Sequence, residues 1–155
     1  MTYPQMITIR RTFTSPVLRD VEAAIVSEVQ RLGLLHRIKA GDRIALAVGS
    51  RGIANIAQVL KTLGKILISA GGQPFIVPAM GSHGGATAEG QAAVLKGLGI
   101  TEAATGLPIR SSMDVHLIRR TDDNLPCYMD RHAWGADHII LVARIKPHTD
   151  FIGSV

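Results

Sequence analysis

Three strongly apolar runs, separated by stretches of helical periodicity, most constrain the fold of this chain. The runs cover residues 43–48, 74–80 and 138–145. Helical patterns lie between them, at 53–69 and again from Thr87 to about Leu98. Continuous apolar strands are typical of parallel sheets that are covered on both faces. The pattern therefore predicts an α/β fold, with a mainly parallel sheet, helices on both faces and a Rossmann-like three-layer organisation.

Weaker patterns predict the remaining elements. Residues 7–13 alternate apolar and polar side chains, which indicates a first strand near a sheet edge. Ser15-Pro16 is a helix start, and the apolar spacing behind it predicts a helix that ends at about Leu35. Further expected elements are short helices at 101–102 and 133–136 and a hairpin of strands 114–120 and 126–129.

The composition fits one globular domain over residues 1–155. Hydrophobic residues make up 46% of the chain and charged residues 19%, which excludes a disordered segment. The net charge is +5, but the lysines and arginines are dispersed. This charge suits a small anionic partner, and we expect no nucleic acid because no basic block is present.

Other function classes are disfavoured by what the sequence lacks. Cys127 is the single cysteine, so no internal disulfide or cysteine metal cluster can form, and we expect a reducing cytoplasm. Residues 1–11 lack the apolar core of a signal peptide. The apolar runs are shorter than the roughly 20 residues of a membrane span, so we expect no membrane partner. No zinc pair, P-loop or nucleophile elbow is present.

Polar clusters follow all three apolar runs. They are Ser50-Arg51, Ser82-His83 and Lys146-Pro147-His148. The carboxyl ends of parallel strands meet at one sheet edge, where open α/β sheets bind their ligands. We therefore expect the three clusters to line one pocket. A chance arrangement of surface residues is the alternative.

The residue types in these clusters suit proton transfer on an anion. Arg51 offers a guanidinium fork to a carboxylate or phosphate. His83 and His148 could act as an acid/base pair on opposite faces of a substrate, which racemisation or epimerisation requires. Lys146 could bind an anion or donate a proton. We expect the other histidines to be structural; these are His36, His116, His132 and His138.

The turn that carries His83 is rich in glycine, from Gly81 to Gln91. Thr87 is a good N-cap for the helix behind it, and a helix N-terminus can receive an anion. The binding candidates of the pocket are Ser50, Ser82, Gly84, Thr87 and Lys146. A flexible turn with an exposed histidine remains the alternative interpretation.

At these same residues the chain resembles the lactate racemase family, the nickel-pincer-nucleotide proteins, and most closely its uncharacterised homologues. The matching segments are 50–56, 74–91, 108–113 and 144–151. The resemblance implies two α/β domains with the active site between them. It also implies a nickel-pincer nucleotide that takes a hydride from Cα of a 2-hydroxy acid and returns it to either face.

The resemblance also implies roles for individual residues. His83 is similar to the first catalytic histidine and His148 to the second, which together exchange the hydroxyl proton. Arg51 is similar to the arginine that holds or polarises the substrate. The helix start at Thr87 resembles the family's phosphate-facing turn.

Two departures from the family pattern concern the substrate. Val48 stands where the lactate racemases have an aspartate, and Gly84-Gly85-Ala86 stands where they have Arg-Pro-Leu. These changes point to a 2-hydroxy acid other than lactate, or to a related substrate.

The resemblance places several functions beyond Val155: the cofactor-anchoring lysine, the nickel-binding histidine and the second domain. We therefore expect this chain to be an N-terminal catalytic domain. We expect it to bind no cofactor or metal by itself and to be inactive alone. Racemisation of a 2-hydroxy acid by this chain would contradict the expectation. The surface left for a second domain predicts self-association as a homo-oligomer. The alternative is a stand-alone α/β module that binds an anionic metabolite or nucleotide without catalysis.

Overall fold

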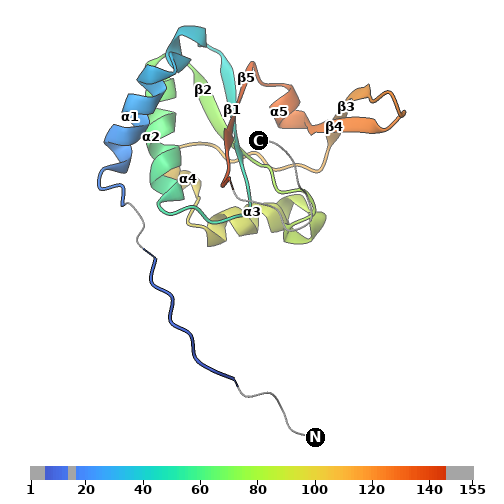
Figure 1. Cartoon of the computed structure of the whole chain (residues 1–155). Coiled ribbons are helices and arrows are strands. Elements are labelled where there is room, and N and C mark those ends of the chain that lie inside the picture. The colour runs from blue at the N-terminus through green and yellow to red at the C-terminus, as the bar shows by residue number, and fades with distance from the viewer. Residues whose placement is uncertain (1–5, 14–16, 146–155) are drawn as a thin grey trace, which may run out of the picture.

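The computed structural model describes residues 6–13 and 17–145. Strands and helices alternate along most of this range (Figure 1). In chain order the elements are α1 (Val21–Arg31), the 3-10 turn η1 (Leu34–Arg37), β1 (Arg43–Val48), α2 (Ile56–Ser69), β2 (Gln73–Pro78), the 3-10 turn η2 (Gly84–Ala86), α3 (Ala88–Gly97), α4 (Glu102–Thr105), β3 (Val115–Arg120), β4 (Pro126–Asp130), α5 (Arg131–Trp134) and β5 (His138–Val142).

The central sheet has the strand order β2-β1-β5, and both pairings are parallel. Val48 at the end of β1 lies opposite Pro78 of β2 and Val142 of β5. All three strands therefore end at the same edge of the sheet. The polar clusters that follow β1 and β2 start from this edge, as the apolar runs predicted.

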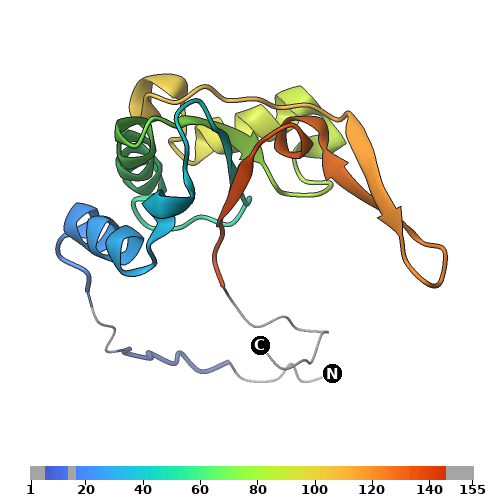
Figure 2. The ribbon, with the colours of Figure 1, turned by 90° about the horizontal axis from the view of Figure 1, so that it is seen from above.

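Helices cover both faces of the sheet, so the predicted α/β fold is confirmed. On one face, Ile44, Leu46 and Val48 of β1 pack with α1, α2 and α3 in the larger core cluster (Figure 2). On the other face, the smaller cluster joins Ala45 and Phe75 to Ala133 of α5. Because side chains alternate along a strand, β1 contributes residues to two hydrophobic clusters, one on each face of the sheet. Small residues on the second face allow the short helix α5 to approach closely.

One further segment pairs with the central sheet, and a separate two-stranded sheet lies beside it in the chain. The segment around Ile109 runs beside β2, where Ile76 donates its N–H to Pro108 O and accepts from Arg110 N, both at 2.8 Å. The antiparallel pair β3–β4 forms the predicted hairpin and projects from the body of the molecule (Figure 1).

The N-terminal elements differ from the expectation. Residues 6–13 are exposed and have no regular secondary structure, so the strand predicted over 7–13 is not present. None of the described strands pairs with this segment. The helix predicted from 15 to 35 is shorter, because Asp20 caps its start by accepting from Ala23 N and Gly33 adopts a φ of +58° behind its end.

The last strand also differs from the expectation. It ends at Val142 rather than at residue 145, and its burial is partial: Leu141 is 77% exposed and Ile139 is 40% exposed. The reason is that β5 is an edge strand whose outer side and second face are open. None of the helices in the described part of the chain is both long and apolar enough to cross a membrane.

Candidate functional site

The site begins at the carboxyl end of β1. The chain leaves β1 toward β2 on one side, while β5 returns on the other side, so this end is a topological switch point of the sheet. Ser50 and Arg51 follow directly, and Gly49 N–H donates to Val142 O at 3.4 Å. Arg51 is exposed, and no hydrogen bond or ion pair engages its guanidinium within residues 6–13 and 17–145.

A side-chain contact joins the ends of two strands. Ser50 Oγ lies 2.5 Å from Nδ1 of His83, although the two residues are 33 positions apart. His83 is exposed, and among the described residues no hydrogen bond engages its other ring nitrogen, Nε2. The predicted convergence of the clusters behind β1 and β2 is therefore observed for Ser50 and His83.

The position of His83 depends on the close packing of its turn against α3. Gly84 has a φ of +66°, and a Cβ there would lie 2.5 Å from the carbonyl carbon of Gly90. Conversely, a Cβ on Gly90 would lie 1.8 Å from Gly84 O. Neither position accepts a side chain without movement of the backbone. A Cβ at Gly85, by contrast, would point into open space despite a φ of +68°.

Polar side chains of α3 fix the same turn. Thr87 is the N-cap, as predicted: its Oγ1 accepts from Gly90 N at 3.0 Å and donates to Gly84 O at 3.3 Å. Gln91, which is buried, donates from Nε2 to Gly81 O at 2.7 Å. The hydroxyl of Thr87 is thus used by the cap, and the carboxylate of Glu89 offsets the positive end of the helix. Both facts weigh against Thr87 as a strong anion contact.

The Ser50–His83 contact allows two arrangements of protons. If the Ser50 hydroxyl donates to Nδ1, the neutral imidazole carries its proton on Nε2 and can only donate a hydrogen bond there. If Nδ1–H donates to Ser50 Oγ, the neutral imidazole keeps a lone pair on Nε2 and can act as a base. The imidazolium that forms when Nε2 takes up a proton still donates from Nδ1 to Ser50 Oγ and can return the proton from Nε2 as an acid. This is what a proton-transfer residue requires.

The other predicted site residues have different outcomes. Lys146 and His148 lie outside the described residues, so their distance to His83 stays a prediction. Ser82 is exposed beside His83, and its carbonyl accepts from Ala86 N. Within the described residues, no group of three or more His, Cys, Asp and Glu side chains is arranged to hold a metal ion.

Two features of the turn were missed or only partly anticipated from the sequence. Ser50 was predicted to bind a ligand, whereas the structure shows it holding His83. Gln91 appears in the sequence analysis only as the end of the glycine-rich turn, whereas its buried side chain donates to the carbonyl oxygen of Gly81. No local sequence signal identified this contact, because the burial of Gln91 depends on how the turn packs.

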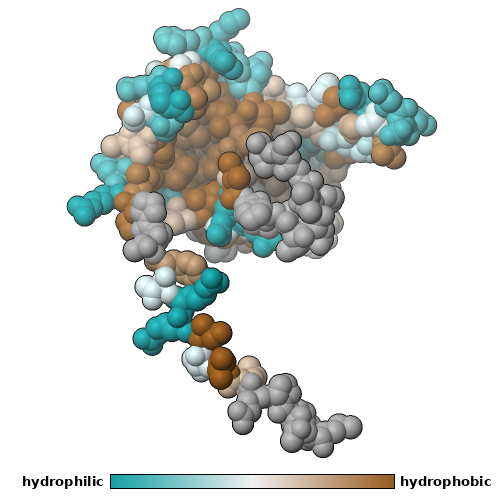
Figure 3. All heavy atoms as spheres, viewed as in Figure 1, coloured by the Kyte–Doolittle hydropathy of each residue, from teal (hydrophilic) through white to brown (hydrophobic). Residues whose placement is uncertain are grey.

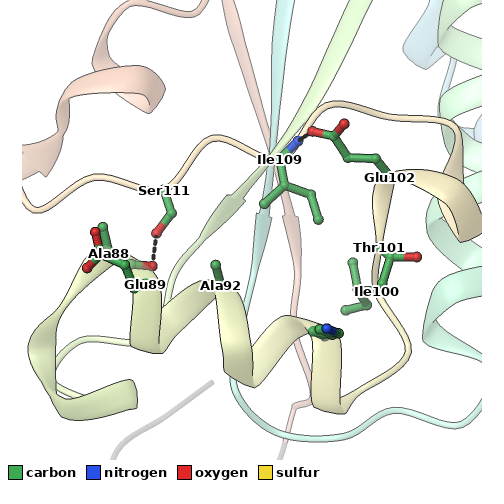
Figure 4. Close-up of a pocket in the computed structure, with 9 residues that line it drawn as sticks. Ala88, Glu89, Ala92, Ile100, Thr101, Glu102, Ile109 and Ser111 are labelled. Carbon is green, nitrogen blue, oxygen red and sulfur yellow. Dashed lines mark hydrogen bonds between the residues drawn. The ribbon is translucent and has the colours of Figure 1, made fainter.

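A separate cleft of about 460 Å³ runs along α3 (Figure 4). Its polar groups are partly engaged within the chain: Ser111 Oγ donates to Ala88 O at 2.8 Å and Glu102 Oε1 accepts from Ile109 N at 2.9 Å. Its lining does not include Ser50, Arg51 or His83. The cleft is therefore distinct from the strand-end site.

Two histidines outside the site have structural partners. His138 Nε2 lies 2.9 Å from Asp42 Oδ2 at the opposite end of the sheet, and His116 stacks on Trp134 with ring centroids 5.9 Å apart. The N–H of Lys39, followed by the hydrogen bond from His138, lowers the pKa of the Asp42 carboxyl. These contacts agree with the structural role expected of both histidines.

Comparisons with known proteins leave the chain without a relative: no family model, no curated protein and no solved structure matches it.

Proposed function

We propose that this chain is the N-terminal catalytic domain of a nickel-dependent 2-hydroxy acid racemase or epimerase, with His83 as one of its proton-transfer residues. The observation that carries the proposal is the 2.5 Å contact between Ser50 Oγ and His83 Nδ1 at the switch point of the sheet. This contact orients the imidazole through Nδ1 and leaves Nε2 without a hydrogen-bond partner among the described residues, at the edge where open α/β sheets bind ligands.

The substrate class follows from the charge beside this histidine. Arg51 is exposed, has no partner among the described residues and follows Ser50 directly. A guanidinium fork binds a carboxylate with two parallel hydrogen bonds. A 2-hydroxy acid carries a carboxylate and a hydroxyl on adjacent carbons. The proposal is that Arg51 binds the carboxylate while Nε2 of His83 takes or returns the hydroxyl proton.

The cofactor that the family resemblance implies, a nickel-pincer nucleotide, supplies hydride transfer at Cα when it is bound. Among residues 6–13 and 17–145 no group of three or more His, Cys, Asp and Glu side chains is arranged around a metal position, so the proposal assigns them no role as nickel ligands. They fit the proton-transfer side of the reaction, and the glycine turn from Gly81 to Gly85 leaves its outer surface open to a nucleotide. His148 and Lys146 remain proposed partners of His83 in this site.

A second candidate is a binding module for an anionic metabolite or nucleotide. Arg51 is exposed and has no hydrogen-bond or ion-pair partner among the described residues, which favours this candidate equally well, because anion binding needs no proton transfer. Under this proposal the Ser50–His83 contact only orders the turn.

Titration calorimetry with 2-hydroxy acid anions tests the proposal. Saturable binding by the wild type and a loss of about tenfold in Arg51→Gln are expected, since one charge-assisted hydrogen bond is worth about 1.4 kcal/mol or more. Arg119→Gln, an exposed arginine of the hairpin, is the matched control. Equal affinity for the 2-hydroxy acid and its deoxy analogue would favour the binding module. Absence of binding by the wild type would contradict the proposal that Arg51 and His83 bind a 2-hydroxy acid.

A further inference from the structure

The free edge of β5 and the unpartnered segment Ile7–Phe13 are complementary features. β5 pairs only with β1, so the backbone groups on its outer side have no strand partner among the described residues. Residues 7–13 alternate in polarity except at Arg11, and their apolar side chains are exposed: Ile7 by 81%, Ile9 by 75% and Phe13 by 75%. The chain therefore contains both a segment with a strand-like pattern, residues 7–13, and an unpaired strand edge, the outer edge of β5.

The handedness of the crossovers says where a strand before α1 belongs. Connections between parallel strands of one sheet share a single hand. The helices α1 and α2 pack on the same face of the sheet (Figure 2), and α2 carries the chain from β1 to β2. A strand that enters β1 through α1 must then lie on the side of β1 away from β2. That side is occupied by β5, and its outer edge is the next free position.

The direction and the length of the connection from residues 7–13 to α1 are also compatible with a strand at the outer edge of β5. Helix α1 begins at the end of the sheet where β1 ends (Figure 1), so a strand parallel to β5 would finish close to its start. Residues 14–20 connect Phe13 to Val21. Seven residues span up to about 23 Å when extended, whereas packed layers lie about 10 Å apart.

The face beside α1 is apolar where this strand would lie. Figure 3 shows apolar side chains gathered in the hollow between α1 and β5. A cavity of about 130 Å³ there is lined by apolar side chains, among them Leu34, Ile38 and Ile140, together with Arg37 and His138. Ile7, Ile9, Arg11 and Phe13 share one face of a strand, since side chains alternate. Placed toward α1, the three apolar side chains of this face would cover the hollow.

We propose that residues 7–13 add to the outer edge of β5 as a fourth parallel strand, with Ile7, Ile9 and Phe13 directed toward α1. Thr8 and Arg10 then lie on the opposite face, beside Leu141 of β5. This inference does not depend on the proposed function, because it concerns the edge of the sheet rather than its carboxyl end.

Disulfide trapping in the full chain tests the strand and its orientation together. In a Cys127→Ser background, Leu141→Cys is combined in turn with Thr8→Cys, Ile9→Cys or Arg10→Cys. All four positions are exposed in the structure, so these variants should fold, which circular dichroism checks. Cross-linking within the monomer is expected for Thr8 or Arg10, at a rate at least tenfold above that for Ile9.

Hydrogen exchange provides a second readout that needs no cysteine. Amides of residues 7–13 are expected to exchange at least tenfold more slowly than in a peptide of the same sequence, and Ile9→Pro should abolish this protection. Equal cross-linking at all three positions, or unprotected amides, would overturn the proposal. Cross-linking only between two molecules would also overturn it, by identifying a second copy as the occupant of the edge.

Discussion

Ser50 Oγ and His83 Nδ1 lie 2.5 Å apart, and this contact ties the end of β1 to the turn that follows β2. Replacement of Ser50 by alanine is expected to change the tautomer of His83 while unfolding free energy falls by less than about 1 kcal/mol, because the pair is solvent-accessible. Long-range ¹H–¹⁵N spectra of the imidazole report the tautomer. Ser82→Ala, at a neighbouring exposed position, should leave the ring signals unchanged. Identical spectra of Ser50→Ala and wild type would contradict the contact.

Gly84 and Gly85 are neighbours in the turn, but their replacement by alanine is expected to lower the free energy of unfolding by different amounts. Gly85→Ala should lower the free energy of unfolding by about 1 kcal/mol, since only the left-handed φ opposes it. Gly84→Ala should cost at least about 2 kcal/mol, because its Cβ would also meet the backbone of Gly90. Urea denaturation measures both values. Equal costs would mean that the turn does not pack on α3 as described.

The pair Asp42–His138 predicts a contribution to stability that depends on pH. The pKa of Asp42 is lowered in the fold, first by the Lys39 N–H and then by His138. A group with a lowered pKa stabilises the fold above its ordinary pKa of about 3.9, and this contribution is lost as the pH falls through the lowered value. Asp42→Asn should therefore be less stable than wild type at pH 6, with the difference narrowing at pH 3. Asp123→Asn, in the exposed hairpin turn, is the control, and a difference that widens toward low pH would contradict the prediction.

The burial of β1 on both faces predicts a large effect of truncation in its centre. Leu46 is fully buried, and Leu46→Ala should cost about 2–5 kcal/mol of unfolding free energy. Leu125 in the hairpin is 63% exposed, so the same substitution there should cost less than about 0.5 kcal/mol. Comparable costs in urea denaturation would contradict the central position of β1.

The sequence was sufficient for the elements whose signals are local. Continuous apolar runs identified β1 and β2, because strands that are buried on both faces consist of consecutive apolar residues. Thr87 identified the start of α3, because helix capping depends on residues close together in the sequence. The exposure of Leu141 was not predictable in this way. An edge strand and a central strand have the same apolar run, and only the strand order distinguishes them.

The candidate site was predicted only in outline. The rule for parallel sheets brought the Ser50 and His83 clusters to one edge, and the structure confirms this for these two residues. The rule cannot say which side chains touch, because contact depends on the turn geometry that Gly84 and Gly90 set between them. The role of Ser50 as the partner of His83 is evident only from their contact in the structure.

The proposal that Ser50 holds His83 to exchange a proton with a bound 2-hydroxy acid is tested by NMR titration of the His83 ring. Saturable shifts of Nε2 are predicted with a 2-hydroxy acid, much smaller shifts with its deoxy analogue, and loss of the difference in Ser50→Ala. Ring signals of His83 that respond to neither acid, or equally to both, would contradict the claim.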